Sequence, residues 1–470
     1  MEYTGMKALV MGLGLHGGGL ESARYLAGHG AELTVTDLRD EKTLAPSIEK
    51  LKAAGISARY VLGRHYIEDF ENAGMVIKNP GVRPDSPYLQ AAKRVETDIS
   101  LFLAASPARL IAVTGSKGKS STSSAIHWVL DKARQGGLLS GKAYLGGNIT
   151  VSPLTFLDAL SPEDDVVLEL SSWQLGDLRE RCLLKPRAAV ITAIMPDHLD
   201  RYGTMDAYVA DKRVIYQGQD SGDLTVAGDD SWGRSFRAET PGRPLVYAEA
   251  PLPEGVAGGW VEGSSGSGLA RIYGEIVELV PAKLLVPGYH QKKNLLAAAL
   301  ALLDLGLPAG FIRESLGIFP GIEHRLEFFH ENRGVRIYND TAATIPEAAA
   351  AAVEAFDQPV VLVTGGTDKN LDFSPLVAAA PKAKAIILLA GTGSDKLTGL
   401  LTGAGIRYQG PFDQVDAAVR AALDTAKPGD TVVLSPGCAS FGMFLNEFDR
   451  GRKWKEAVLR EINVSWQVRR

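Results

Sequence analysis

The chain has 470 residues, 45% of them hydrophobic, which is too long for one compact core and predicts two or three globular domains. A formal net charge of −5 without an extended basic run excludes a large nucleic-acid surface and favours a small-molecule ligand. We expect a cytoplasmic protein without a membrane span. The two cysteines, Cys182 and Cys438, lie far apart, and the sequence has neither a secretory pattern nor a long apolar stretch.

The first block of the chain alternates short β-type runs with helical stretches, which is typical of parallel α/β sheets. We predict three strands and a helix at residues 7–11, 32–36, 75–77 and 97–104. Gly12-Leu-Gly-Leu-His-Gly17 lies between a strand and a helix, and Asp37 ends the next strand, which matches a dinucleotide fingerprint. On these residues alone the turn could hold NAD or another nucleotide diphosphate, because a lone match is weak.

The second block begins after Ser106-Pro107 and opens on the most informative motif, Thr114-Gly-Ser-Lys-Gly-Lys-Ser120. The motif follows an apolar run and precedes a helix-compatible segment, so it predicts a phosphate-binding loop. Its glycines let backbone N–H groups approach an anion, Lys119 supplies charge, and the Ser120 hydroxyl can bind the Mg²⁺ that accompanies a nucleotide. Val113 stands where the full pattern has glycine, so the loop is a shortened variant, and a plain surface connection is the alternative.

Two further features of this block indicate a metal-dependent nucleotide site. Glu169 lies in the apolar strand predicted at 166–170, and Mg²⁺ with Ser120 as co-ligand is favoured over a structural acid. His198, in Met195-Pro-Asp-His-Leu-Asp-Arg-Tyr202, follows the strand predicted at 188–192. Ligands bind at such carboxyl ends, so His198 is a candidate second metal ligand, although a loop histidine is usually solvated.

The rest of the chain continues the alternation after an irregular Gly/Pro-rich region that we expect at 229–274. A helix is predicted after Pro287-Gly288 and a linker at Phe319-Pro-Gly321. A third sheet domain then starts with a hairpin, with strands predicted at 327–329, 335–338, 360–363, 385–389 and 431–434. The predicted domains are 1–106, 107–321 and 322–470.

The combination of motifs resembles that of the ATP-dependent Mur ligases of peptidoglycan synthesis, in particular the glutamate-adding branch. The motifs are Thr114-Gly-Ser-Lys-Gly-Lys-Ser120, Gly146-Gly-Asn-Ile149, Leu168-Glu-Leu-Ser-Ser-Trp-Gln174, Asp197-His-Leu-Asp-Arg-Tyr202, His324-Arg-Leu-Glu327, Asn339-Asp340 and Ser435-Pro-Gly-Cys-Ala-Ser440. The resemblance covers the whole chain. It implies an α/β protein of three domains: an N-terminal Rossmann-like domain for a UDP substrate, a central P-loop ATPase domain and a C-terminal Rossmann-like domain for the amino acid.

The resemblance also implies the substrates and assigns residues to them. The expected enzyme is a cytoplasmic monomer that joins UDP-N-acetylmuramoyl-L-alanine to D-glutamate at the expense of ATP. UDP-substrate candidates are Leu15, His16, Asp37, Arg39, Asn79, Gly81 and Asn148. ATP candidates are Gly115, Ser116, Lys117, Gly118, Lys119, Ser120, Ser121, Asn294, His324, Arg325 and Asp340. Amino-acid candidates are Thr344, Lys369, Ser440 and Phe448, and catalytic candidates are Lys119, Asn148, His198 and Lys212.

Most of these residues also have an ordinary structural interpretation. Asn294 could cap its helix, Asp340 could cap a turn, and Ser440 could satisfy a neighbouring backbone group. His324-Arg325 could be linker surface. Without the resemblance, only Lys369 in Gly365-Gly-Thr-Asp-Lys369 stands out.

The implied chemistry requires cations. A carboxylate is a poor electrophile, so ATP first converts it to an acyl phosphate, which the incoming amine attacks. Lys119 and, by resemblance, two Mg²⁺ ions bring the carboxylate and the phosphates of ATP together. The resemblance implies that Ser120 and Glu169 bind one ion and that His198 binds the other. Lys212 matches the lysine that CO₂ carbamylates in this family, and a carbamate would be an anionic Mg²⁺ ligand. From the residues alone, an exposed helical lysine is favoured at this position.

Three positions depart from the family pattern, all near the amino-acid site. Ala342 replaces a common lysine, Thr367 stands where an acid is common, and Glu447 takes the place of a phenylalanine that occurs one position later as Phe448. These departures leave L-glutamate as an alternative to D-glutamate.

Three other interpretations compete with this one. The first is a related ligase, such as a folylpolyglutamate synthase or one that adds alanine or a diamino acid. The glycine-rich N-terminal domain argues against the folate branch, and the short loop and the segment 168–174 favour the glutamate-adding branch. The others are a nicotinamide-dependent oxidoreductase and a non-catalytic nucleotide-binding module. The set Lys119, Glu169 and His198 argues against both.

Overall fold

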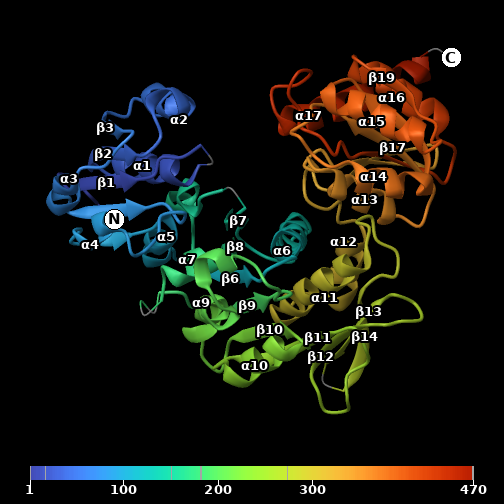
Figure 1. Ribbon diagram of the computed structural model, residues 1–470. Coiled ribbons are helices and arrows are strands. Elements are labelled where there is room, and N and C mark those ends of the chain that lie inside the picture. Colours follow the sequence, from blue (N-terminus) through green and yellow to red (C-terminus); the bar gives the residue numbers. More distant parts are fainter. Residues whose placement is uncertain are drawn as a thin grey trace. The chain divides into compact units, whose positions relative to one another are not determined.

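The computed structural model describes residues 2–15, 17–149, 151–179, 181, 183–272 and 274–467 (Figure 1). The chain forms two compact units, Met1–Ala282 with Lys292–Leu316, and Lys283–Gln291 with Gly317–Arg470. The first unit holds two β-sheets and the second holds one, which confirms the predicted three-domain α/β fold. The three sheets lie within 1–106, 107–321 and 322–470, and the end points of these domains stay predictions.

The N-terminal sheet is five-stranded and parallel, in the order β3-β2-β1-β4-β5. Its strands are β1 (Lys7–Met11), β2 (Glu32–Asp37), β3 (Ala58–Leu62), β4 (Met75–Lys78) and β5 (Val95–Glu96). Its helices are α1 (Gly18–Gly28), α2 (Glu41–Ala53), α3 (Ile67–Asn72), α4 (Pro87–Gln90) and α5 (Asp98–Ala105). The three predicted strands and the helix are confirmed. The strand order reverses beside β1, and such a point is where open parallel sheets bind ligands.

The turn between β1 and α1 requires glycine because the backbone passes close to itself. Gly12 and Gly17 have positive φ angles of 90° and 101°. A Cβ on Gly19 would lie only 2.2 Å from the Gly12 carbonyl oxygen. The first turn of α1 therefore packs directly on the end of β1, and its N-terminus is brought to the ligand-binding edge of the sheet.

The middle sheet has nine strands in the order β14-β13-β12-β11-β10-β9-β6-β8-β7. They are β6 (Arg109–Thr114), β7 (Ala143–Gly147), β8 (Asp165–Glu169), β9 (Ala188–Ile191), β10 (Leu224–Gly228), β11 (Arg243–Ala248), β12 (Gly258–Val261), β13 (Gly268–Ile272) and β14 (Glu275–Val280). Only the pairs β12–β13 and β13–β14 are antiparallel. The helices are α6 (Lys119–Gln135), α7 (Ser172–Gly176), α8 (Leu199–Tyr202), α9 (Met205–Gln217), α10 (Ser231–Glu239), α11 (Tyr289–Asp304) and α12 (Ala309–Gly317).

The expectation of an irregular region at 229–274 is wrong. This stretch contains α10, β11, β12 and β13. Some of its glycines serve close strand packing, since a Cβ on Gly258 would lie 2.1 Å from the Val246 carbonyl oxygen. Glycine in a strand interior weakens the sequence signal of a strand, although the close approach of two backbones demands it. The predicted helix after Pro287-Gly288 is confirmed as α11.

The two sheets of the first unit share one hydrophobic core. Leu20 of α1 and Phe102 of α5 belong to the same buried cluster as Leu154 and Leu157. The last two lie in the 3₁₀ turns η1 (Pro153–Thr155) and η2 (Leu157–Ala159). Phe102 meets Phe156 edge-to-face, with ring centroids 6.0 Å apart. The carboxyl edges of both sheets are thereby fixed relative to each other within this unit.

The second unit has a six-stranded sheet in the order β15-β16-β20-β17-β18-β19. The strands are β15 (Glu327–Asn332), β16 (Val335–Asn339), β17 (Val360–Gly365), β18 (Ala383–Leu389), β19 (Gln409–Phe412) and β20 (Thr431–Leu434). The helices are α13 (Pro346–Glu354), α14 (Ser374–Ala379), η3 (Ala380–Lys382), α15 (Thr392–Gly403), α16 (Val415–Thr425) and α17 (Glu447–Gln467). The predicted hairpin is confirmed, because β15 and β16 pair antiparallel while the other pairs are parallel.

Helices cover both faces of this sheet. Val361 and Val363 of β17 belong to a core cluster with Trp454 of α17, whereas Val360 and Leu362 belong to a second cluster. Successive strand residues point to opposite faces, so the alternation places one cluster on each side. None of the helices that the structure describes is long and apolar enough to cross a lipid bilayer.

Candidate active site

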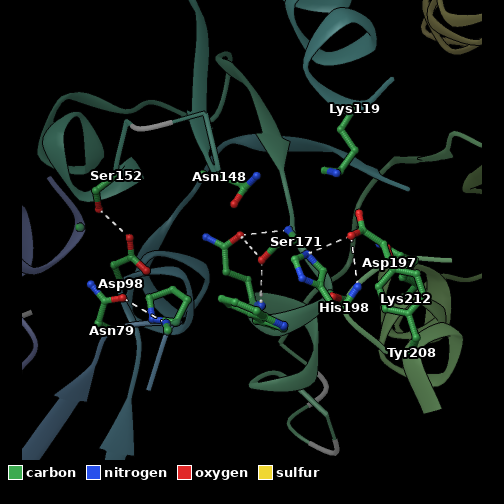
Figure 2. Close-up of a pocket in the computed structure, with 17 residues that line it drawn as sticks. Asn79, Asp98, Lys119, Asn148, Ser152, Ser171, Asp197, His198, Tyr208 and Lys212 are labelled. Carbon is green, nitrogen blue, oxygen red and sulfur yellow. Dashed lines mark hydrogen bonds and ion pairs between the residues drawn. The ribbon is translucent and has the colours of Figure 1, made fainter. Parts of the chain in front are cut away.

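A cavity of about 480 Å³ lies in the first unit, at the carboxyl ends of strands from both of its sheets (Figure 2). It is lined by Gly18, Asn79, Pro80, Gly81, Asp98, Lys119, Gly147, Asn148, Ser152, Ser171, Ser172, Trp173, Gln174, Asp197, His198, Tyr208 and Lys212. The predicted residues Asn79, Gly81, Lys119, Asn148, His198 and Lys212 are thus brought together. They come from segments that lie far apart in the sequence, from Asn79 to Lys212.

The predicted phosphate loop has the strand–loop–helix geometry that such a loop requires. It joins β6 to α6, which begins at Lys119. Gly115 has φ 147°, and a Cβ there would lie 1.9 Å from the Thr192 hydroxyl oxygen. Gly118 has φ 92°, and a Cβ there would lie 2.3 Å from the Asn294 amide oxygen. Gly118 caps α6 without a side-chain hydrogen bond, so the first N–H groups of the helix are left for an anion.

Two lysines converge on one backbone carbonyl of this loop. Lys119 Nζ donates to the carbonyl oxygens of Gly115 at 3.0 Å and Ser116 at 3.1 Å. Lys212 Nζ, from α9, donates to the same Gly115 oxygen at 2.9 Å. Lys212 is 1% exposed, so the interpretation of an exposed helical lysine is wrong. Burial and the nearby charge of Lys119 lower the pKa of Lys212 to about 7.

Glu169 is the last residue of β8 and is 1% exposed. Its Oε1 accepts a hydrogen bond from Asn148 Nδ2 at 2.8 Å, and its Oε2 accepts one from Ser123 Oγ at 3.5 Å. Both donors are neutral. Lys119 is close enough for the charge of Glu169 to oppose the effect of burial on the pKa of that lysine. A buried carboxylate held by neutral donors beside a phosphate loop has the chemistry of a Mg²⁺ ligand.

His198 lies at the N-terminal end of α8 with a positive φ of 52°. Its side chain is 46% exposed and lies in the cavity wall. The ring packs against Trp173, with centroids 5.0 Å apart, and the Arg201 guanidinium lies 4.3 Å from the centre of the Trp173 ring. Asp197 Oδ1 is 3.9 Å from His198 Nε2. A left-handed backbone at a non-glycine residue is unfavourable, and here it accompanies a histidine in the wall of the cavity.

The UDP-substrate candidates surround the glycine-rich turn. Asp37 accepts the backbone N–H of Gly14 at 3.2 Å and that of Arg39 at 3.0 Å. Asn79 Nδ2 donates to the Gly12 carbonyl at 3.4 Å, and Asn79 Oδ1 accepts the N–H of Gly81 at 3.1 Å. The turn after β1 and the ends of β2 and β4 are therefore linked. Leu15 and Arg39 are exposed beside them, and His16 lies outside the described residues.

The ATP candidates of the second unit form a separate group. His324 is buried, has φ 69°, and its Nδ1 is 2.9 Å from Asn339 Nδ2. Asp340 accepts the N–H of Leu326 at 3.0 Å and the Ser435 hydroxyl at 2.7 Å. Burial raises the pKa of Asp340 to about 6. The side chain of Asp340 thus bonds to residues 14 and 95 positions away in the sequence, and its assignment to ATP stays a prediction. Arg325 is exposed.

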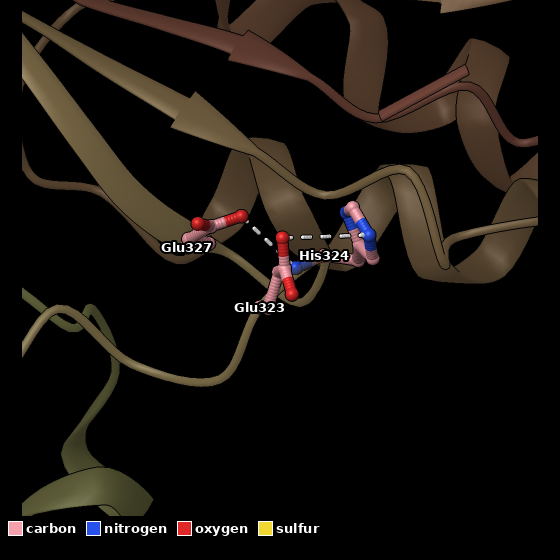
Figure 3. Close-up of side chains that lie close together, drawn as sticks. All are labelled: Glu323, His324 and Glu327. Carbon is pink, nitrogen blue, oxygen red and sulfur yellow. Dashed lines mark hydrogen bonds and ion pairs between the residues drawn. The ribbon is translucent and has the colours of Figure 1, made fainter. Parts of the chain in front are cut away.

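Glu323, His324 and Glu327 place ligand-type atoms within 4.8 Å of one another (Figure 3). Lys455 Nζ lies 2.9 Å from a carboxylate oxygen of both Glu323 and Glu327. The other Glu327 oxygen accepts the His324 N–H at 3.0 Å and Asn339 Nδ2 at 3.0 Å. The ammonium group of Lys455 already occupies one oxygen of each carboxylate, so the geometry favours a role in holding His324 rather than a metal centre.

The amino-acid candidates also lie in the second unit. Ser440 is buried, Thr344 is half-buried and Lys369 is exposed, with its Nζ 5.8 Å from the centre of the Phe441 ring. The Phe448 ring packs on His324 with centroids 5.5 Å apart and is 51% exposed.

The three departures from the family pattern make backbone contacts in this region. The Ala342 N–H donates to the His324 carbonyl at 3.0 Å. The Glu447 carbonyl accepts the Thr341 hydroxyl at 2.8 Å. Thr367 forms a bridge with Ala439.

Several residues of the cavity wall were not predicted. Asp98, Ser152, Ser171, Gln174, Trp173 and Tyr208 line it. Asp98 is buried and accepts the Ser152 hydroxyl at 3.0 Å, although it lies in the helix predicted at 97–104. Ser171 and Gln174 form a capping box at the start of α7. The spacing of serine and glutamine gives a signal for a helix start, but not for a cavity.

Comparison with known proteins identifies the family. Residues 6–100 match the family profile of the Mur ligase MurD-like N-terminal domain, 113–302 the Mur ligase middle domain and 324–438 the Mur ligase glutamate ligase domain. A UDP-N-acetylmuramoylalanine–D-glutamate ligase from Treponema pallidum is 41% identical over 97% of this chain and 97% of its own length. The chain belongs to the Mur ligase family. A ligase of the same name from Roseiflexus is 41% identical over 97% of this chain and 99% of its own length.

Solved structures of other Mur ligases share the fold. A UDP-N-acetylmuramate-alanine ligase from Thermotoga maritima superimposes with a TM-score of 0.53 and 17% identity, covering 97% of this chain and 100% of that one. A MurF from Acinetobacter baumannii gives a TM-score of 0.54 and 15% identity, covering 96% and 93%. The match to the Mur ligase middle domain implies that the chain binds ATP.

Proposed function

We propose that the protein is the ATP-dependent ligase that adds D-glutamate to UDP-N-acetylmuramoyl-L-alanine in peptidoglycan synthesis. The observation that carries this proposal is the 41% identity to ligases of that name over 97% of the chain. The structure supports it with a cavity whose wall includes Gly18, directly after the glycine-rich turn, and Lys119 of the phosphate loop. The first step forms a bond between the alanyl carboxylate and the γ-phosphorus of ATP and releases ADP. The glutamate amine then attacks the acyl carbon, phosphate leaves and the amine loses a proton.

The UDP substrate is assigned to the turn after β1 and its neighbours. Leu15, His16, Asp37, Arg39, Asn79 and Gly81 hold its nucleotide end, and Asn148 its acceptor end. Asp37 orients the turn through the N–H groups that it accepts, and the N-terminus of α1 favours the diphosphate. This assignment replaces the NAD interpretation of the same turn.

ATP is assigned to the phosphate loop and to residues near it. Its phosphates are assigned to Gly115, Ser116, Lys117, Gly118, Lys119, Ser120 and Ser121. Asn294, which lies beside Gly118, is assigned to the same nucleotide. We assign His324, Arg325 and Asp340 of the second unit to the same nucleotide. Lys119 places a positive charge where negative charge increases during phosphoryl transfer, in a half-buried position that strengthens the interaction.

Mg²⁺ fits the donor set of the cavity. Ser120 and Glu169 would hold one ion, and His198 with a modified Lys212 the other. Mg²⁺ supplies charge neutralisation between the two anionic reactants. Glu169 offers a buried carboxylate whose hydrogen bonds come from neutral groups, and Asn148 fixes its orientation. His198 is held in the cavity wall by its contact with Trp173.

A carbamate on Lys212 is the proposed source of the anionic ligand. With the pKa of Lys212 at about 7, a large part of the amine is neutral near neutral pH. Its lone pair can attack CO₂, forming an N–C bond and releasing a proton, which converts a cation into an anion. The carbamate retains one N–H, so the hydrogen bond to the Gly115 carbonyl can persist. Burial at 1% exposure protects the modified group from bulk water.

Thr344, Lys369, Ser440 and Phe448 are proposed to hold the incoming glutamate, and the protein is proposed to act as a monomer. The departures at Ala342, Thr367 and Glu447 leave L-glutamate as the alternative amino acid. One experiment tests the whole assignment: phosphate release from ATP is measured with UDP-N-acetylmuramoyl-L-alanine and each amino acid in turn. Release that depends on D-glutamate supports the proposal. Release that depends on L-glutamate changes the amino acid, and no release with any amino acid contradicts the function.

A further inference from the structure

A buried ion pair joins the end of β4 to the end of α7, two segments whose neighbouring residues line the cavity. Lys78 ends β4, and Asp177 follows α7. Their side chains are 4% and 6% exposed, and Lys78 Nζ lies 2.7 Å from Asp177 Oδ2. Burial lowers the pKa of Lys78 and raises that of Asp177, and each charge opposes the shift of the other. Two charges buried this deeply depend on each other for compensation.

The lysine also holds one wall of the cavity. Lys78 Nζ donates to the Val82 carbonyl at 3.1 Å. The segment from Asn79 to Val82 is a turn, closed by a hydrogen bond from the Val82 N–H to the Asn79 carbonyl at 2.9 Å. Asn79, Pro80 and Gly81 of this turn line the cavity. One ammonium group therefore braces the turn that carries proposed substrate-binding residues.

The aspartate holds the opposite wall. Its backbone N–H donates to the Trp173 carbonyl at 3.1 Å, and Ser172, Trp173 and Gln174 of α7 line the cavity. The capping box of Ser171 and Gln174 fixes the start of the same short helix. Asn79 and Ser171, which line the cavity (Figure 2), thus lie on two segments that the ion pair joins from outside the cavity.

We propose that Lys78 and Asp177 are positioning residues for the UDP substrate, because their contact sets the spacing of the two cavity walls that the substrate must bridge. The proposal rests on the proposed function for the identity of that substrate. Neither side chain is among the residues that line the cavity. The pair acts through Asn79, Gly81 and the residues of α7.

The test is the affinity for UDP-N-acetylmuramoyl-L-alanine, measured by calorimetry without ATP on the full chain. Lys78→Met and Asp177→Asn each remove one partner, and we expect the dissociation constant to rise at least about tenfold, because a loosened wall weakens every contact that depends on it. At saturating UDP substrate, kcat should stay within about threefold of the wild type, because the phosphate loop is unchanged.

The matched control is Arg181→Met. Arg181 joins the same two sheets through Glu96, at 2.6 Å, but neither residue lines the cavity. This variant should lower the unfolding temperature and leave the dissociation constant within about twofold of the wild type, because it breaks a more exposed ion pair, with side chains 32% and 12% exposed, whose members do not line the cavity. If all three variants lose stability and none loses affinity, the pair is only structural and the proposal is overturned.

A second variant covers the case in which a single unpaired charge prevents folding. Lys78→Met with Asp177→Leu removes both charges, and such an apolar replacement of a buried ion pair commonly folds. It should bind the UDP substrate at least about tenfold more weakly than the wild type. Wild-type affinity in this variant overturns the proposal. If the wild-type protein does not bind this substrate, the proposed function fails, and the substrate role of the pair fails with it.

Discussion

Lys212 combines burial, a lowered pKa and a contact with the phosphate loop. We predict that Lys212→Ala is nearly inactive, because the cavity loses the proposed anionic ligand opposite His198. A small carboxylate such as formate or acetate should recover part of the rate by occupying the vacated oxygen positions. The measurement is phosphate release with and without the carboxylate.

Arg213→Ala, next to Lys212 on α9, is the control and should show no such recovery, because Arg213 pairs with Glu239 instead. Mass spectrometry or a ¹³C signal that shows only unmodified Lys212 in active, bicarbonate-supplied enzyme contradicts the carbamate.

Glu169 tests the metal assignment. Glu169→Gln keeps the size of the side chain and its contact with Asn148 but removes the charge that holds a hard cation. We expect the Mg²⁺ concentration needed for half-maximal rate to rise, and raised Mg²⁺ to restore part of the activity. A Mg²⁺ titration identical to that of the wild type would assign Glu169 to a structural role.

Two lysines of the phosphate loop provide a matched pair. Lys119 is half-buried with two carbonyl acceptors, whereas the Lys117 side chain is 70% exposed and lies 3.7 Å from Asp197. Lys119→Ala should reduce kcat by about 10²-fold or more, because its charge acts where the dielectric is low. Lys117→Ala should cost less than about tenfold, since solvent screens an exposed charge. Circular dichroism checks that both variants fold, and equal losses would refute the ranking.

The junction between β6 and α6 leaves little space for an added side-chain atom at Gly118. We predict that Gly118→Ala raises the KM for ATP by about tenfold or more, because the new Cβ would lie 2.3 Å from Asn294 Oδ1 and the backbone φ is 92°. Gly137→Ala is the control: Gly137 has φ 73° but no atom within 4 Å of the added Cβ. It carries the backbone strain without the clash. A similar KM for ATP in both variants would contradict the steric argument for Gly118.

The sequence predicts those elements whose signals are local. Strand-to-helix turns with glycine and lysine, and the hairpin of β15 and β16, follow from spacing within a few residues. The segment 229–274 is different, because glycines such as Gly258 and Gly259 are required by neighbouring strands that only the fold brings close. The polar wall of the cavity, including Asp98 and Ser152, likewise depends on contacts between distant segments.

The burial of Lys212 could have been predicted from the spacing of apolar residues around it, but the general tendency of lysine to be exposed favoured the opposite prediction. In α9, the residues three and four positions before and after Lys212 are all buried. They are Tyr208, Val209, Ile215 and Tyr216. That spacing places Lys212 in the middle of the apolar face of the helix. Lysine is rarely fully buried, so the general rule opposes this pattern. A lysine at the centre of an apolar helix stripe is therefore the feature that marks a functional candidate.

Each of the two units has its own buried hydrophobic core. We predict two calorimetric unfolding transitions, with UDP raising only the one that belongs to the first unit. All described UDP-substrate candidates lie in that unit, and a ligand stabilises the structure that binds it. The shift should be a few degrees at saturating UDP. A single transition that moves as a whole would contradict independent unfolding.

The chain passes between the two units three times, after Ala282, Gln291 and Leu316. Lys283–Gln291 belongs to the second unit, where the Tyr338 hydroxyl donates to the Leu285 carbonyl at 2.8 Å and Val286 lies against Gly321. A single cut before Gly317 therefore separates this segment from its partners and exposes Val286. Transplanting the second unit from a relative therefore requires three junctions, so that Lys283–Gln291 is exchanged together with the C-terminal sheet.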